Sequence, residues 1–204
     1  MSTNFTDPSD MSQATSAPAL VLIDLQKGMD AWDHWGGTRN NPQAETVAAS
    51  LLTHWRAQGW PIFHVQHSST SPTSPLRPGL PGHAIKEEVA PISGEPVIGK
   101  TVNSAFIGTD LETRLREAGL SKVVIVGLTT EHCISTSVRM SANLGFETYL
   151  IEDAIAAFPK IGRNGKSYSA EMVHQIELAN LEGEFATVLT GEALLQLWPG
   201  ITAS

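Results

Sequence analysis

The sequence contains one cysteine, Cys133, in 204 residues. A single cysteine allows no disulfide within the chain and no metal site built from a cysteine cluster, and it fits a protein of the reducing cytoplasm. Residues 1–18 are polar and hold no Lys or Arg, and the first cation is Lys27. A secretory signal needs a basic start and an apolar segment, and no apolar run reaches the length of a membrane span. We therefore expect a cytoplasmic protein with no membrane partner.

Positive charge is also scarce. The chain carries 13 Lys and Arg against 21 Asp and Glu, a formal net charge of −8, which argues against a nucleic-acid partner. Hydrophobic residues make up 41% of the chain, which is sufficient for one buried α/β core at this length. We expect a flexible N-terminal tail over residues 1–17 and a single domain over residues 18–204.

Six short apolar segments predict strands, and several are nearly continuous Val, Ile and Leu, as in parallel strands covered on both faces. They are residues 19–25, 60–67, 95–100, 122–128, 147–153 and 186–190. Helical patterns lie between them, at residues 42–59, 108–120, 131–145 and 169–183. This alternation implies right-handed βαβ crossovers. The predicted fold class is α/β: a single-domain, Rossmann-like, three-layer α/β/α architecture around a mostly parallel six-stranded sheet.

The connection over residues 68–95 breaks this alternation. It is rich in Pro, Ser and Gly, and loops this long in compact domains are usually functional or disordered. We interpret it as a lid or a subunit contact, with simple disorder as the alternative.

Three ionisable residues follow or close predicted strands. Asp24 lies near the end of the first strand, Lys100 closes the third, and Cys133 follows the fourth by five residues. Ligands of parallel α/β sheets bind outside the carboxyl ends of the strands, so these side chains are expected to converge on one crevice. A cysteine in the first turn of a helix is favoured as a thiolate by the helix dipole. Lys100 would supply the cation that holds Asp24 and Cys133 ionised.

Each of these residues also has a plainer interpretation. A lone cysteine is more often a small buried hydrophobe than a nucleophile, and Lys100 alone would be a solvated lysine at a strand end. Asp24 could cap a turn, although a carboxylate within an apolar segment should be partnered or shifted in pKa. The coincidence of all three at strand ends favours function.

With these positions, the chain resembles the isochorismatase-like cysteine hydrolase superfamily, which includes nicotinamidases, N-carbamoylsarcosine amidase and ureide hydrolases. The resemblance covers about residues 18–190. It rests on the segments LVLIDLQKGM, GKTVNSAFIGTDLETRLREAG and VVIVGLTTEHCISTSVRMSANLGFETYLIEDA. It implies the isochorismatase-like hydrolase fold, with Asp24, Lys100 and Cys133 as a catalytic triad.

The resemblance also implies a mechanism. The Cys133 thiolate would attack an amide or ureide carbonyl, with Asp24 as general base and acid. The family's cis peptide bond corresponds to Leu128–Thr129, and it would direct the N–H groups of Thr129 and Cys133 at an oxyanion.

Two departures limit what the resemblance implies. The nicotinamidase metal site is built around an Asp-x-His pair, whereas this chain has HVQHSST, with His64 and His67 but no such aspartate. We therefore expect no metal and no other cofactor. True isochorismatases cleave a vinyl ether without a nucleophilic cysteine, so the presence of Cys133 favours C–N hydrolysis.

Substrate contacts are expected from the loops that follow the strands. The candidates are Trp32, Trp35, His67, Arg77, Phe106, His132, Ile155 and Phe158. A Cys133–His132 dyad is poor on geometry, because adjacent helical residues do not face each other. A substrate or interface role suits His132 better.

The favoured function is therefore a metal-independent amidohydrolase acting on a small amide, carbamoyl compound or ureide. The alternatives are a vinyl-ether hydrolase and a non-enzymatic redox sensor that uses Cys133. Family resemblance further implies a homo-oligomer, either a dimer or a tetramer.

Overall fold

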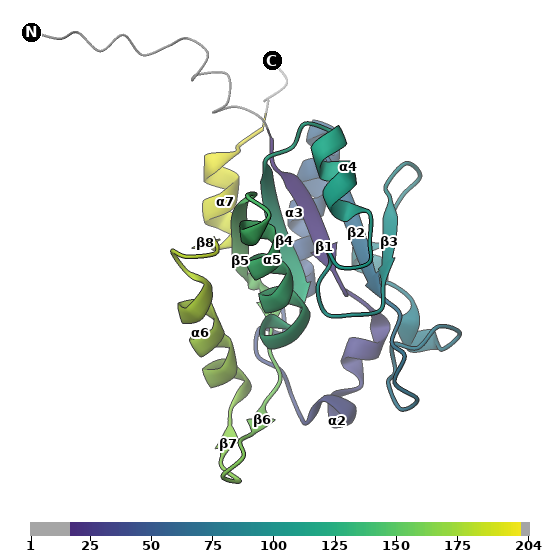
Figure 1. The fold of residues 1–204 in the computed structure, drawn as a ribbon, viewed down its shortest axis with the longest axis vertical. Helices are drawn as coiled ribbons and strands as arrows, with labels where there is room; N and C mark the ends of the chain where they lie inside the picture. Colours follow the sequence, from purple (N-terminus) through teal and green to yellow (C-terminus); the bar gives the residue numbers. More distant parts are fainter. Residues whose placement is uncertain (1–16, 201–204) are drawn as a thin grey trace, which may run out of the picture.

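The computed structural model describes residues 17–200, so the expected tail lies almost entirely outside the described part of the chain. One sheet of six parallel strands runs through the molecule in the order β3-β2-β1-β4-β5-β8 (Figure 1). The strands are β1 (Ala19–Ile23), β2 (Ile62–His67), β3 (Val97–Lys100), β4 (Lys122–Leu128), β5 (Glu147–Ala156) and β8 (Thr187–Leu189). The α/β class and the six-stranded sheet predicted from the sequence are confirmed.

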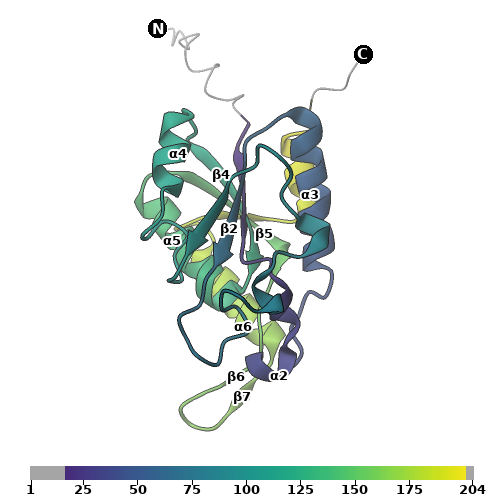
Figure 2. The same ribbon diagram turned by 90° about the vertical axis from the view of Figure 1, so that its right-hand side faces the viewer.

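Helices cover both faces of the sheet and give three layers (Figure 2). Helix α3 (Ala44–Gln58) and α7 (Gly191–Leu197) bury apolar residues against one face, and α4 (Leu111–Glu117), α5 (Ser135–Asn143) and α6 (Ala170–Leu181) cover the other. All five residues of β1 are buried, as expected for a central parallel strand with helices on both sides. The layers therefore follow from the apolar runs of the sequence.

The two central strands approach each other closely at Gly127, near the end of β4. Its φ is +132°, and a Cβ atom there would lie 1.9 Å from the carbonyl oxygen of Ile23 on β1. Only glycine combines that backbone conformation with that contact. Gly127 thus fixes how the carboxyl ends of β1 and β4 meet.

Several elements were absent from the expected pattern. The additional helices, turns and strands are η1 (Lys27–Asp30), α2 (Trp32–Trp35), η2 (Pro81–His83), η3 (Glu87–Val89), β6 (Lys160–Ile161), β7 (Ser167–Tyr168) and α7. The strands β6 and β7 pair antiparallel in a small separate sheet. No helix within residues 17–200 is both long and apolar enough to cross a lipid bilayer.

Residues 68–95 form an irregular segment that is fastened to the domain by an ionic cluster in which the side chains of Arg39, Glu45 and Lys86 are buried and that of Asp30 is exposed. The Lys86 ammonium lies 2.6 Å from Asp30 Oδ1 and 2.6 Å from Glu45 Oε1, and Arg39 pairs with the same Glu45 carboxylate. Burial acts to raise the pKa of Glu45, but hydrogen bonds from Arg39 and Lys86 outweigh it, and the pKa lies below its usual value. The cluster therefore ties the segment to the start of α3.

Replacing Lys86 with methionine is expected to loosen this segment. The change leaves a mostly buried Glu45 with one cation instead of two, and we expect a loss of about 1–3 kcal/mol of stability. Urea denaturation measures the loss, and mass spectrometry after limited thermolysin digestion should find earlier cleavage within residues 68–95.

Lys27→Met is the matched control. Lys27 joins the same two parts of the chain through Glu87, but both side chains are exposed, and exposed pairs contribute little. Equal effects of the two substitutions would contradict the anchoring role of Lys86.

Candidate active site

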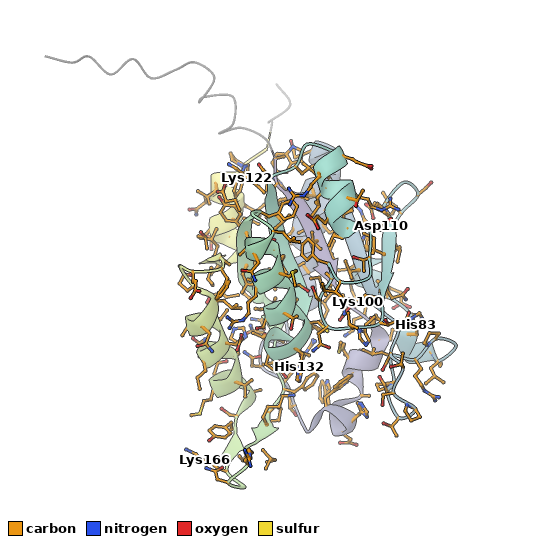
Figure 3. The ribbon with its side chains drawn as sticks, in the orientation of Figure 1. His83, Lys100, Asp110, Lys122, His132 and Lys166 are labelled. Atoms are coloured by element: carbon orange, nitrogen blue, oxygen red, sulfur yellow. The ribbon has the colours of Figure 1, made fainter. Side chains whose placement is uncertain are left out.

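Three polar side chains meet at the carboxyl ends of neighbouring strands. Asp24 follows β1 directly, Lys100 is the last residue of β3, and Cys133 lies in η4 (Thr130–Ile134), the turn after β4. Figure 3 shows Lys100 and His132 far from Lys122, the first residue of β4. The structure thus brings Asp24, Lys100 and Cys133 together at the edge where parallel sheets bind ligands.

Asp24 reaches this point through a left-handed backbone turn. Its φ is +55°, a conformation that aspartate tolerates better than most residues. The Gln26 N–H donates to the Asp24 carbonyl at 2.8 Å and closes the turn. The chain therefore leaves the strand abruptly, and the Asp24 carboxylate remains wholly buried at its end.

Cys133 is held by a π-helical turn. The Ile134 N–H donates to the Thr129 carbonyl at 3.2 Å, five residues back, and helix α5 begins only at Ser135. The expected first turn of an α-helix is therefore a π turn, a form often found at functional sites. The peptide bond between Leu128 and Thr129 is cis, and both Thr129 and Cys133 line a cavity.

The Lys100 ammonium contacts four polar groups of the site at once. Its Nζ lies 2.7 Å from Asp24 Oδ2, 3.0 Å from His67 Nδ1, 3.2 Å from the Val102 carbonyl and 3.3 Å from Cys133 Sγ. An ammonium has three protons, so these four neighbours compete for it. A thiol sulfur is the weakest acceptor of the four, and its hydrogen bond from Lys100 would strengthen once the sulfur becomes negative.

Burial governs the ionisation of the two acids. It raises the pKa of Asp24 above its usual value, against the opposing charge of Lys100. Burial also raises the pKa of the Cys133 thiol strongly, and the negative charge of Asp24 adds to the effect. Both effects favour the thiol, whereas the positive charge of Lys100 favours the thiolate, as expected, without outweighing them. Ionisation requires transfer of the thiol proton to a base.

Asp24 is placed to be that base. Its Oδ1 is buried and accepts no hydrogen bond from residues 17–200. One of its carboxylate oxygens lies within 4.8 Å of Cys133 Sγ. The arrangement can therefore move a proton from sulfur to carboxylate while Lys100 stabilises both negative forms.

Some side chains of this cluster are also of the types that bind metal ions. Asp24, His67 and Cys133 each offer one potential ligand atom, all within 4.8 Å of one another. Lys100 Nζ contacts all three residues, so a positive charge already occupies the centre. A metal ion bound there would have to displace this ammonium, and the residues fit an ammonium-centred cluster better than a metal site.

His64 takes no part in the cluster. Residues separated by three along a strand point to opposite faces, and the His64 ring is buried with its Nε2 2.9 Å from Glu95 Oε2. The His64 and His67 pair of the HVQH sequence therefore does not form one site.

A cavity of about 370 Å³ opens over Cys133, a volume suited to a small ligand. Trp35, His67 and His132, which were predicted to contact substrate, line it. Phe158 lies behind Trp35, with the two rings stacked at 5.8 Å, and supports this wall without lining it.

The other predicted contacts lie elsewhere. Phe106 is buried in the core with its ring centroid 6.0 Å from that of Phe146, and Ile155 is fully buried within β5. Trp32 is exposed, and neither it nor Arg77 lines the cavity. Position at or after a strand therefore does not suffice to place a side chain in the cavity.

Several lining residues were not predicted. They are Met29, His34, Ser69, Ser71, Ser74, Leu76 and Asn103. All come from segments that follow β1, β2 or β3, so the rule that places ligands beyond strand ends could have found them. The serines and Leu76 belong to the segment over residues 68–95, which therefore forms a wall of the cavity.

The chain is similar to known proteins over most of its length. Residues 18–193 match the isochorismatase domain family. The isochorismatase family protein YrdC of Bacillus subtilis is 49% identical over 177 residues, 87% of this chain and 94% of that protein. Ureidoacrylate amidohydrolase RutB of Klebsiella pneumoniae is 27% identical over 183 residues, 72% of this chain and 76% of that protein.

The structure agrees with these sequence matches. A crystal structure of an isochorismatase-family protein from Chromobacterium violaceum superposes with a TM-score of 0.85 and 43% identity, over 98% of this chain and all of that chain. The family match spans most of the chain and includes all three polar residues at the strand ends. The protein therefore belongs to the isochorismatase family of hydrolases.

Proposed function

We propose that this protein hydrolyses a C–N bond of a small amide, carbamoyl compound or ureide through a thioester on Cys133. The observation that carries the proposal is the position of Lys100 Nζ, 2.7 Å from Asp24 and 3.3 Å from Cys133. One buried ammonium can stabilise a carboxylate base and a nucleophilic sulfur in turn. The names of the relatives ureidoacrylate amidohydrolase and streptothricin hydrolase support a hydrolytic role.

The proposed reaction begins with proton transfer. Asp24 takes the thiol proton as Cys133 Sγ attacks the carbonyl carbon, and the resulting oxyanion accepts hydrogen bonds from the N–H groups of Thr129 and Cys133. Asp24 then gives the proton to the leaving nitrogen, the C–N bond breaks, and ammonia or an amine departs. Water attacks the thioester, its proton passes through Asp24 to the sulfur, and the acid product leaves.

Lys100 has an electrostatic role in each step. While Asp24 is ionised, the ammonium pairs with the carboxylate, and when the sulfur carries the charge, the ammonium can turn its proton to Cys133. Neither change needs Lys100 to move far, because both atoms lie within 3.3 Å of Nζ. The ammonium is thus already in position when negative charge develops, which is the condition for electrostatic preorganisation.

A redox-sensing role suits Cys133 poorly. Sensor cysteines are accessible and have a lowered pKa, whereas Cys133 is 8% exposed and burial raises the pKa of its thiol. A buried thiol with a raised pKa can still act as a nucleophile when a neighbouring base removes its proton.

Substitution of Cys133 tests the proposal. Cys133→Ala should abolish ammonia release from a panel of primary amides and ureides, because no thioester can form. Circular dichroism should show that the variant is folded, and mass spectrometry of the quenched wild-type reaction should find an acyl group on Cys133. Undiminished ammonia release, or cleavage of a vinyl ether by the Cys133→Ala variant, would refute C–N hydrolysis through the cysteine.

A further inference from the structure

His67 is fixed on several sides at the wall of the cavity. Its backbone N–H donates to Gln26 Oε1 at 2.8 Å, and Gln26 Nε2 donates back to the His67 carbonyl at 3.0 Å. Its ring places Nδ1 3.0 Å from Lys100 Nζ. Gln26 is itself fully buried. Both the backbone and the ring of His67 are therefore held by groups inside the protein.

The contact with Lys100 determines the tautomer of His67. Asp24 is buried and lies 2.7 Å from Nζ, so Lys100 must be an ammonium to neutralise it. An ammonium has no lone pair and can only donate, and Nδ1 must therefore accept. The ring is then neutral and carries its one proton on Nε2.

The Nε2–H group is unpaired within the described part of the chain. Within residues 17–200, nothing accepts a hydrogen bond from it, although the ring lines the cavity beside Cys133. One nitrogen of the His67 imidazole ring, Nδ1 or Nε2, lies within 4.8 Å of Cys133 Sγ, and both residues line the same cavity. A substrate attacked by the sulfur would thus bring atoms about two or three bonds from its carbonyl carbon close to this donor.

We propose that His67 is a specificity-determining residue whose Nε2–H selects substrates with an oxygen acceptor, a second carbonyl or a carboxylate, next to the scissile carbonyl. This inference rests on the proposed function for the identity of the reacting atom. It adds a requirement on the neighbouring part of the substrate, which the Asp24, Lys100 and Cys133 cluster does not impose.

Two serines that line the cavity with His67 also favour a ligand with an oxygen acceptor. Ser69 Oγ accepts from the Ser71 N–H at 3.3 Å, and Ser74 Oγ accepts from the Leu76 N–H at 3.2 Å. Each hydroxyl proton remains available to a ligand, because no group in residues 17–200 accepts it. Among the described lining residues, the sole carboxylate is Asp24, which Lys100 already neutralises. The cavity therefore offers donors to an oxygen but no counter-charge to an ammonium group.

A set of small primary amides of similar size tests this selection. 3-Oxobutanamide presents a second carbonyl, malonamate presents a carboxylate, butanamide presents neither, and 3-aminopropanamide presents an ammonium group. The measurement is the concentration of each compound that halves the rate at which iodoacetamide alkylates Cys133. It reports occupancy of the cavity and does not require turnover.

We expect 3-oxobutanamide, malonamate or both to protect Cys133 at concentrations about 10- to 100-fold lower than butanamide, because an unpaired donor penalises the compound without an acceptor. 3-Aminopropanamide should protect no better than butanamide. The ratio between 3-oxobutanamide and malonamate shows whether the acceptor is a neutral carbonyl or a carboxylate. Equal protection by all four compounds would overturn the proposal.

Two substitutions separate the donor role of His67 from its contact with Lys100. Asn places its amide near the position of Nδ1 and can still accept from Lys100, whereas Gln reaches the position of Nε2 and can still donate to substrate. The preference for oxygen-bearing amides should vanish in His67→Asn and persist in His67→Gln. The reverse order would show that His67 acts only by positioning Lys100.

Two further measurements complete the test. Thr70→Val, on the same segment but exposed and outside the cavity, should leave every protection constant unchanged. Nitrogen NMR of the imidazole should show a proton on Nε2 and none on Nδ1, and the opposite tautomer would overturn the inference. If the protection pattern holds but no amide is hydrolysed, the proposed function fails and the role of His67 stands.

Discussion

Asp24→Asn is expected to lower kcat/KM for amide hydrolysis by about 10²- to 10⁴-fold, the range for loss of a general acid–base group. The same change should make Cys133 more acidic. The negative charge of Asp24 helps to raise the pKa of the thiol, and its removal also frees Lys100, 3.3 Å from the sulfur, from its ion pair. Hydrolysis and thiol reactivity should therefore change in opposite directions.

The pH dependence of alkylation by iodoacetamide measures the second effect. Loss of a neighbouring charge typically shifts a pKa by about one to three units, so the midpoint for Cys133 should move to lower pH by about that amount. Asp110→Asn is the control, since Asp110 forms an exposed surface pair with Arg114. A midpoint that stays in place or moves to higher pH would show that Asp24 does not act on the sulfur.

The sequence predicts the position of the cluster better than its ionisation. Apolar runs reveal where parallel strands end, and Asp24, Lys100 and Cys133 each stand at or just beyond such an end. Their convergence then follows from topology alone. The resting state of the Cys133 thiol depends on how deeply the sulfur is buried and on the distance to Asp24, and neither quantity is contained in the spacing of residues along the chain.

The substrate contacts show a similar limit. Phe106 and Asn103 both follow β3, and the sequence cannot tell that the aromatic ring turns into the core beside Phe146 while Asn103 faces the cavity. Bulky apolar side chains near a strand end compete for the same helix-covered face, and packing decides the outcome.

One element that was not predicted, helix α7, has a recognisable start pattern in the sequence. Helix α7 follows Thr190, whose side chain accepts from the Ala193 N–H at 3.1 Å, an N-cap pattern visible in the sequence. The hydrogen bonds of Gln26 left no such signal, because they connect the turn after β1 to residues 41 and 57 positions away. Contacts of that range become apparent only in three dimensions.

Lys100→Met is expected to destabilise the protein by about 3–5 kcal/mol at neutral pH, the usual cost of leaving a buried charge without its partner. Asp24 is fully buried, and water cannot replace the ammonium. Asp24→Asn/Lys100→Met is the matched comparison, because it removes the stranded charge and should recover most of the loss. Urea denaturation of the wild type, Lys100→Met and the double variant measures these differences. Neither variant should release ammonia.

The pH dependence identifies the stranded carboxylate as the cause. Burial already raises the pKa of folded Asp24, and removal of Lys100 takes away the main opposing charge, so the pKa rises further. Between the unfolded value, about 3.9, and this raised value, the folded state holds a proton that the unfolded state has lost. Stability then falls as the pH rises. The deficit of Lys100→Met relative to the double variant should therefore shrink from pH 7 to pH 5, and a constant deficit would mean that Lys100 acts through packing instead of charge.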